Sequence, residues 1–199
     1  MKSDIKVKKY NDIPHNLNEI KCYMRLGKDN LNFDSLIYDC LSECENEFDF
    51  KVCFGLFDIS LQNNEIDFGF DTIVSKNLFH NLSGCDKAVI FAATAGIGID
   101  RLIRLYTKTD SARSLCIDAI GSEAVESLCD CFENEIKKGY DYSAKRYSPG
   151  YGDLPLDFQK SVFKALSCEK NIGLYLNESL LMVPTKSVTA IIGVSNEIT

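Results

Sequence analysis

Histidine and tryptophan are scarce in this sequence. Its 199 residues include two histidines, four prolines and no tryptophan. Neither His15 nor His80 lies near a patterned cluster of Cys, Asp or Glu. Zinc sites and Ser–His–Asp triads both place a histidine beside other ligands or a nucleophile. We therefore expect no catalytic histidine and no metal site.

Long apolar runs and an excess of basic residues are also absent. No segment approaches the eighteen or so apolar residues of a membrane span. No apolar core follows the lysines near the start, so the sequence predicts no signal peptide. The formal net charge of −7 argues against a surface for nucleic acid or anionic membrane. We expect a cytoplasmic protein that binds neither nucleic acid nor membrane.

The nine cysteines include no CxxC pair, and their number is odd. A disulfide framework would need paired cysteines in an oxidising compartment. Cys40 and Cys44 share one face of a predicted helix, and Cys129 and Cys131 form a CxC inside another. We interpret the cysteines as small apolar core residues. The alternative is a metal or iron–sulfur site, whose thiols are usually spaced more tightly.

The order of apolar patterns predicts an α+β fold. Helical spacing occurs in residues 13–27, 33–48, 75–84, 99–110, 111–139 and 156–168. Two segments rich in aromatic and β-branched residues, 50–61 and 65–75, flank "QNN" as in a hairpin. Residues 86–96 predict a buried strand, and residues 172–195 predict strands interrupted at Pro184. Because helices and strands alternate without a βαβ rhythm, we expect α+β over a doubly wound sheet.

The stretch "ATAGIGIDR" follows a predicted strand and opens a predicted helix, as a dinucleotide-binding loop would. That fingerprint is G-x-G-x-x-G, and its third glycine is Arg101 here. A bulky cation does not fit where the helix must pack closely on the strand. We interpret the segment as a plain strand-to-helix turn.

Residues 146–155, "RYSPGYGDLP", form the most unusual stretch. The two prolines fix φ and remove N–H groups, while Gly150 and Gly152 permit positive φ or a close backbone approach. Arg146 offers a bidentate fork to a carboxylate, and Tyr147 and Tyr151 can face a heterocycle or a cation. This set suits a ligand with a carboxylate, an aromatic base and a positive centre. The alternative is a surface turn with a salt-bridged arginine.

This loop resembles the S-adenosylmethionine-binding motif in the activation domain of cobalamin-dependent methionine synthase. The family pattern is an arginine, two residues, Pro-Gly-Tyr, three residues and a proline. The segments "DAIGSEAVESLCDCF", "LNESLLMVPTKSVTAIIGV" and "NEIKCYMRLG" are similar to further parts of the family, the last to the stand-alone form. The likeness covers most of residues 16–194.

The resemblance implies a twisted antiparallel sheet with flanking helices, curved around an S-adenosylmethionine groove. It implies a single unit over residues 1–199, with an N-terminal helical part of about 1–48 and an S-adenosylmethionine-binding part of about 49–199. It assigns ligand binding to Glu126, Arg146, Ser148, Gly150 and Tyr151. Arg146 would hold the methionine carboxylate and Glu126 the ammonium group. A second acidic family position is Tyr140 here, and an N-terminal acidic contact has no match.

The resemblance also implies a role in reactivation. Members present S-adenosylmethionine to oxidised cobalamin while a flavodoxin-like donor supplies an electron. No cobalamin-binding module is found in this sequence, so we expect the cobalamin on a partner, a methionine synthase or other corrinoid protein without its own activation domain. Alternatives are an activator of another corrinoid methyltransferase and an S-adenosylmethionine-binding module without methyl transfer. A conventional methyltransferase would need a Gly-rich βαβ start, which is missing.

Overall fold

The computed structural model describes residues 4–26 and 33–197. Five strands form the main sheet, and the others form a three-stranded and a two-stranded sheet. The strands are β1 (Lys6–Tyr10), β2 (Phe50–Asp58), β3 (Ser60–Gln62), β4 (Glu65–Asp67), β5 (Thr72–Val74), β6 (Lys87–Thr94), β7 (Tyr140–Ser143), β8 (Tyr175–Leu176), β9 (Met182–Val183) and β10 (Ser187–Glu197). The helices are α1 (Leu17–Tyr23), α2 (Asp34–Cys44), α3 (Lys76–Asn81), α4 (Ile97–Tyr106), α5 (Ser111–Lys137), α6 (Phe158–Leu166) and α7 (Cys168–Ile172).

The main sheet is antiparallel throughout, in the order β1-β2-β6-β10-β7. Its central strand β6 pairs along its whole length with both β2 and β10. Both faces of β6 are covered, which is why its sequence is a continuous apolar run rather than an alternating one. The predicted α+β class, with a twisted antiparallel sheet and flanking helices, is confirmed.

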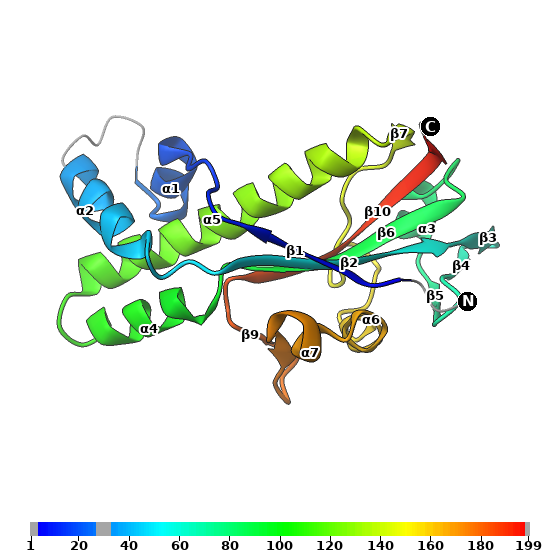
Figure 1. The fold of residues 1–199 in the computed structure, drawn as a ribbon. Coiled ribbons are helices and arrows are strands. Elements are labelled where there is room, and N and C mark those ends of the chain that lie inside the picture. The colour runs from blue at the N-terminus through cyan, green and yellow to red at the C-terminus, as the bar shows by residue number, and fades with distance from the viewer. Residues whose placement is uncertain (1–3, 27–32, 198–199) are drawn as a thin grey trace.

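Two separate cores lie on the two faces of this sheet. Alternate residues of β6 divide between them, because successive side chains of a strand point to opposite faces. Val89 and Phe91 pack with Leu128 and Phe132 of α5, whereas Ile90 packs with α6 and α7. Figure 1 shows α5 along one side of the sheet and α6 and α7 along the other.

Helix α5 joins the sheet to a helical end of the molecule. Its 27 residues extend about 40 Å at 1.5 Å per residue. The C-terminal half lies on the sheet, while Cys116, Ile117 and Ile120 of the N-terminal half form a third core with α1, α2 and α4. The middle of α5 therefore lies where the helical end meets the sheet (Figure 1).

The predicted hairpin forms, and its turn explains the asparagines. Asn63 and Asn64 both have positive φ, 52° and 67°, between β3 and β4. Two consecutive left-handed residues make the type I′ geometry that favours Asn in two-residue loops.

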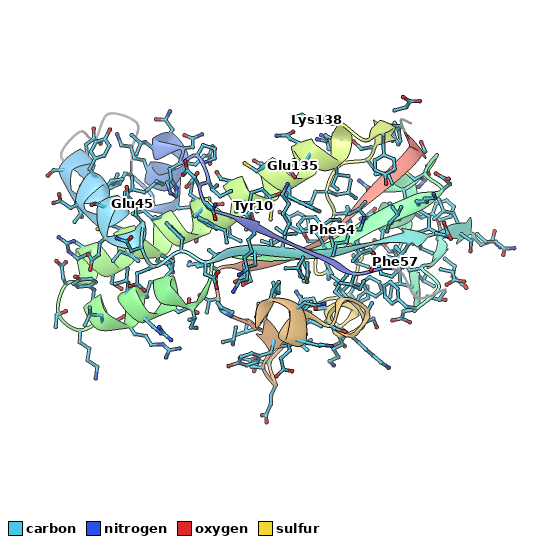
Figure 2. The ribbon with its side chains drawn as sticks, viewed as in Figure 1. Tyr10, Glu45, Phe54, Phe57, Glu135 and Lys138 are labelled. Atoms are coloured by element: carbon cyan, nitrogen blue, oxygen red, sulfur yellow. The ribbon has the colours of Figure 1, made fainter. Side chains whose placement is uncertain are left out.

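Two edge strands were not predicted. Residues 6–10, assigned to the N-terminal helical part, form β1, and residues 140–143 form β7 at the opposite edge. The Tyr10 hydroxyl donates a hydrogen bond to the Glu135 carboxylate at 3.1 Å, and both residues are labelled in Figure 2. Lys8 pairs with the same carboxylate. Both edges gain their partners from elements far away in the chain. The predicted helix end at Gly27 lies outside the described residues.

The glycines of "ATAGIGIDR" serve close packing. Gly96 has φ +91°, and a Cβ at Gly98 would lie 2.3 Å from the backbone oxygen of Glu47. The space that a pyrophosphate would need above this turn is filled by the chain segment before β2. The structure therefore agrees with a plain strand-to-helix turn.

Most cysteines lie in the cores as small apolar side chains. Cys40, Cys44 and Cys116 belong to the helical core, and the Sγ atoms of Cys53 and Cys168 lie 3.9 Å apart in the core under α6 and α7. Within residues 4–26 and 33–197, no group of three or more His, Cys, Asp or Glu side chains could hold a metal ion. In the same ranges, no helix combines the length and apolar character needed to span a membrane.

Candidate functional site

The loop 148–154 is a compact structure fixed at both ends. The backbone of Tyr147 pairs with that of Ile191 on β10, through hydrogen bonds of 2.9 and 2.8 Å. Within the loop, the N–H of Gly150 donates to the oxygen of Leu154 at 2.9 Å, and the N–H of Tyr151 donates to that of Ser148 at 3.1 Å. Leu154 is buried in the core beneath. The turn thus presents its outer residues to solvent on a fixed base.

Gly150 and Gly152 are required by this turn. Their φ values are +89° and +55°, which residues with a Cβ adopt at a cost. Tyr151, between them, has 71% of its surface exposed. Its ring lies 6.4 Å from that of Tyr147 in an edge-to-face arrangement. The backbone therefore turns the Tyr151 ring outward, where a ligand or partner can reach it.

Arg146 precedes this loop and reaches a row of carboxylates on α5. Its guanidinium lies 2.8 Å from Glu126, 3.0 Å from Asp130 and 3.4 Å from Glu133. Positions 126, 130 and 133 fall on one helix face, because α-helical side chains recur every three to four residues. The Tyr147–Ile191 pairing sets the distance between the loop and α5, so the tertiary structure brings Arg146 to this face.

The charge balance of the cluster is negative. Three carboxylates surround one guanidinium, although Lys137 pairs with Glu133 at 2.8 Å. Burial alone lowers the pKa of Arg146, but the carboxylates of Glu126, Asp130 and Glu133 raise that pKa above its usual value. Arg146 therefore stays charged. Burial raises the pKa of the neighbouring Cys129 thiol, so that thiol stays neutral.

Helix α1 approaches the same face of α5 from the N-terminal side. The buried carboxylate of Glu123 accepts hydrogen bonds from the backbone N–H of Asn16 and from Ser127, at 2.8 and 2.7 Å, and lies 2.8 Å from Nδ1 of His15. Asn16 also caps α1. Glu123 thereby fixes α1 beside α5, one helical turn from Glu126.

The phenol of Tyr23 on α1 lies in an acidic environment. Burial raises its pKa first, and the carboxylates of Glu126 and Glu19 raise it further, followed by those of Glu123 and Asp130. Tyr23 of α1 thus comes near Glu126 of α5.

A shallow cavity of about 470 Å³ adjoins Arg146. It is lined by Asp130, Glu133, Asn134, Lys137, Lys145 and Arg146. A larger cavity of about 860 Å³ lies elsewhere, under α6 and α7, and includes Phe57, labelled in Figure 2. We place the candidate site at the smaller cavity and the adjoining Arg146–Glu126 contact, because the charged groups able to bind a zwitterionic ligand converge there.

The predicted residues divide into two neighbouring groups. Glu126 and Arg146 are in direct contact, and Ser148, Gly150 and Tyr151 lie on the loop that follows Arg146. Arg146 is ion-paired, as the alternative of a salt-bridged turn also expects. Asp130 and Glu133 were not predicted from the sequence. Their spacing from Glu126 on a predicted helix was the signal that could have revealed them.

The fold and this arginine–carboxylate cluster define a class: an α+β domain with an exposed, glycine-containing loop beside an acidic helix face. Comparison with known families gives the narrower assignment. The model of the vitamin B12 dependent methionine synthase activation domain matches residues 79–198, more than half of the chain. The chain therefore belongs to this family.

The solved structures agree on the fold. The chain is similar to the MetH reactivation domain, crystallised bound to AdoHcy, with a TM-score of 0.77. The match covers 100% of this chain and 80% of that one at 15% sequence identity, which shows a shared fold. A comparison with curated protein sequences found no match.

Proposed function

We propose that this chain binds S-adenosylmethionine and presents its methyl group for reductive methylation of cob(II)alamin carried by a partner protein. The observation that carries the proposal is the contact of Arg146 with Glu126 beside the loop 148–152, in a chain of the activation-domain family. The similar MetH reactivation domain was crystallised with AdoHcy, the product of methyl transfer from this ligand.

The ligand's amino-acid end suits the arginine–glutamate contact. Its ammonium and carboxylate are attached to one carbon and are therefore only a few ångströms apart. The Glu126 and Arg146 groups meet at 2.8 Å, so a small separation admits both ligand charges between them. One protein ion pair is then exchanged for two protein–ligand pairs, with the carboxylate on the guanidinium fork and the ammonium on Glu126.

Charge also favours the methyl donor over its product. S-adenosylmethionine carries a sulfonium and a net charge of about +1, whereas S-adenosylhomocysteine is neutral overall. The carboxylates of Glu126, Asp130 and Glu133 outnumber by one the cations that pair with them, Arg146 and Lys137. Tyr151 offers an exposed ring whose face can attract the sulfonium. We infer that product release is assisted by the loss of this positive charge.

The chain's own contribution to the reaction is positioning. Reduced cobalt is itself a strong nucleophile, so methyl transfer breaks the S–CH₃ bond and forms a Co–CH₃ bond without a general acid or base. Arg146 and Glu126 would fix the ligand's amino-acid end, while the loop backbone and Tyr151 would orient the sulfonium. Holding two reactants in line can supply several kcal/mol of barrier reduction.

Two partners are needed for this function. One is a cobalamin-dependent methionine synthase or other corrinoid protein that lacks its own activation domain. The other is a flavodoxin-like donor of the electron that reduces cob(II)alamin. The same site also fits activation of a different corrinoid methyltransferase, or an S-adenosylmethionine-binding module without methyl transfer.

Binding is tested by calorimetry with Arg146→Ala, Arg146→Lys and the control Arg113→Ala. Arg113 is similarly exposed and pairs with Glu43 and Asp110, away from the loop. Loss of Arg146 should weaken S-adenosylmethionine binding by about 1.5–3 kcal/mol, or about 10- to 100-fold, and lysine should restore only part because the fork is lost. Arg113→Ala should bind like the wild type. Equal affinity of the two alanine variants would remove Arg146 from the site.

Methyl transfer is tested with a partner loaded with cob(II)alamin, an electron donor and S-adenosylmethionine. The visible spectrum should change to that of methylcobalamin only when this chain is present. Tyr151→Ala should reduce the yield, whereas Tyr175→Ala, which alters an exposed tyrosine on β8, should not. Binding without remethylation of any corrinoid protein would favour the binding-module alternative.

A further inference from the structure

We infer that Asp153 is a positioning residue that holds the ligand loop, residues 148–152, against α3. The inference rests on the proposed function only in taking this loop as the ligand-binding one. Asp153 follows residues 148–152 directly, within the turn that ends at Leu154, and its carboxylate accepts hydrogen bonds from the Ser75 hydroxyl and from the backbone N–H groups of Lys76 and Asn77, the latter two at 2.8 and 3.2 Å. These contacts join segments 76 to 78 residues apart.

The backbone hydrogen bonds of the loop do not join it to α3. Three of them close the turn, from the N–H of Gly150 to Leu154, from that of Tyr151 to Ser148 and from that of Leu154 to Tyr151. All three are internal, so they define the shape of the turn, while the Tyr147–Ile191 pairing fixes only the residue before it. Asp153 supplies a side-chain connection from the loop to a separate element.

The start of α3, which Asp153 contacts, is held in place by burial and hydrogen bonding. Ser75 is buried, and its Oγ accepts a hydrogen bond from the N–H of Leu78 at 3.1 Å while its hydroxyl donates to Asp153. Leu78 and Leu82 are fully buried in the core beneath α6. A movement of Asp153 would therefore break its hydrogen bonds to the start of α3, whose Leu78 is packed in the core. The packing of α3 thus restricts the movement of the loop.

A second contact fixes the loop on the same base. A Cβ at Gly152 would lie 2.5 Å from the hydroxyl of Tyr147 and 2.6 Å from Nδ2 of Asn77. The Tyr147 hydroxyl in turn donates to the backbone oxygen of Tyr151 at 3.3 Å. The backbone of the loop at Gly152 thus packs directly against the side chain of Asn77, and the next residue, Asp153, is hydrogen-bonded to the start of α3.

The ionised form of Asp153 makes these bonds. The hydrogen bond from Ser75 lowers the pKa of Asp153, and the N–H groups of Lys76 and Asn77 lower it further. Hydrogen bonds to a charged acceptor are stronger than those between neutral groups. The function of Asp153 is then to reduce the ordering cost that the ligand would otherwise meet on binding, a cost that preorganised loops avoid.

The test compares Asp153→Ala with Asp110→Ala. Asp110 caps α5 through a hydrogen bond from the N–H of Arg113 at 3.0 Å, far from the loop, so it loses the same kind of bond. Two quantities are measured on the full chain: the dissociation constant for S-adenosylmethionine, and the hydrogen-exchange rates of the Gly150, Tyr151 and Leu154 amides. Asp153→Asn and Ser75→Ala serve as further variants.

Asp153→Ala should weaken binding about tenfold and accelerate exchange of the loop amides by a similar factor, the effect of losing a strong cap. Asp110→Ala should change both by less than about twofold, although each variant loses a cap. Asp153→Asn keeps one acceptor oxygen and should recover part of both quantities, while Ser75→Ala should resemble Asp153→Ala.

Unchanged loop exchange in both Asp153→Ala and Ser75→Ala would overturn the positioning role, as would equal effects of the Asp153 and Asp110 variants. If the wild type fails to bind S-adenosylmethionine, the proposed function is wrong, and the exchange rates still decide whether Asp153 holds the loop. If Asp153→Ala does not fold, Asp153→Asn and Ser75→Ala carry the same comparison.

Discussion

Replacing Arg146 tests whether its carboxylate cluster stabilises the fold as well as the site. Its side chain is 19% exposed, and its three partners differ in burial: Glu126 is 45% exposed, Asp130 66% and Glu133 12%. The two exposed pairs contribute about 0–1 kcal/mol each. Glu133 keeps Lys137 at 2.8 Å when Arg146 is lost, so its carboxylate retains a countercharge. We therefore expect Arg146→Ala to lower the free energy of unfolding by about 2 kcal/mol, part of it from lost packing of the arginine stem.

The assay is urea unfolding at low and high salt, with thermal unfolding in parallel. A loss of about 2 kcal/mol corresponds to about 6 °C in Tm for a chain of this size. In 1 M NaCl the difference from wild type should shrink, because the Debye length falls to about 3 Å. The free energy of unfolding of Arg146→Lys should lie between those of wild type and Arg146→Ala, since lysine restores the charge without the guanidinium fork. A loss below about 0.5 kcal/mol, or one that salt does not reduce, would refute the argument that ion pairs with α5 carry this stability.

Four further predictions follow from other parts of the structure. The protein purified without oxygen should be colourless and free of stoichiometric iron and zinc, since most of its thiols pack in cores; a metal assay showing one cluster per chain would reverse this interpretation. Burial raises the pKa of Glu123, but hydrogen bonds from His15, Ser127 and Asn16 outweigh burial and lower that pKa overall. The stability that ionised Glu123 gives is therefore lost as the pH falls through its folded-state pKa. In urea titrations, wild type should lose stability on acidification more steeply than Glu123→Gln, and parallel curves would contradict this. Gly152→Ala should destabilise more than Gly173→Ala, because both have positive φ but only the former Cβ meets other atoms; equal unfolding midpoints would disprove the close seat of the loop. Raising the salt concentration should weaken S-adenosylmethionine binding more than S-adenosylhomocysteine binding, a difference that calorimetry at two ionic strengths measures and whose absence would argue against charge selection.

In the proposed function, charge and positioning affect different steps of ligand binding. The acidic face of α5 would attract a cationic ligand at a distance, whereas Asp153 would act only through the loop that it holds. A variant of Asp130 should therefore change the salt dependence of binding, and a variant of Asp153 should change affinity at every salt concentration.

Local sequence determined the elements whose patterns are strong. The apolar periodicity of residues 111–139 predicted α5, which spans Ser111–Lys137, and the continuous apolar run of residues 86–96 predicted the central strand β6. The paired asparagines at 63 and 64 predicted the hairpin turn, because few other residues accept positive φ. The motif of residues 146–155 also indicated the family, which the match to the activation-domain model confirms.

Only the tertiary structure decided what depends on distant pairing. Strands β1 and β7 are short edge strands whose hydrogen-bond partners lie in β2 and β10, so their own residues carry too weak a pattern to reveal them. The three-carboxylate environment of Arg146, the approach of Tyr23 to Glu126, and the contact of Asp153 with α3 likewise join segments that are far apart in the chain or lie on different elements. The sequence determines which side chains can ionise, which backbone positions can turn and which residues can pack. The order of the strands and the path of α5 determine which of these residues come into contact, because contacts across the fold depend on the packing of whole elements.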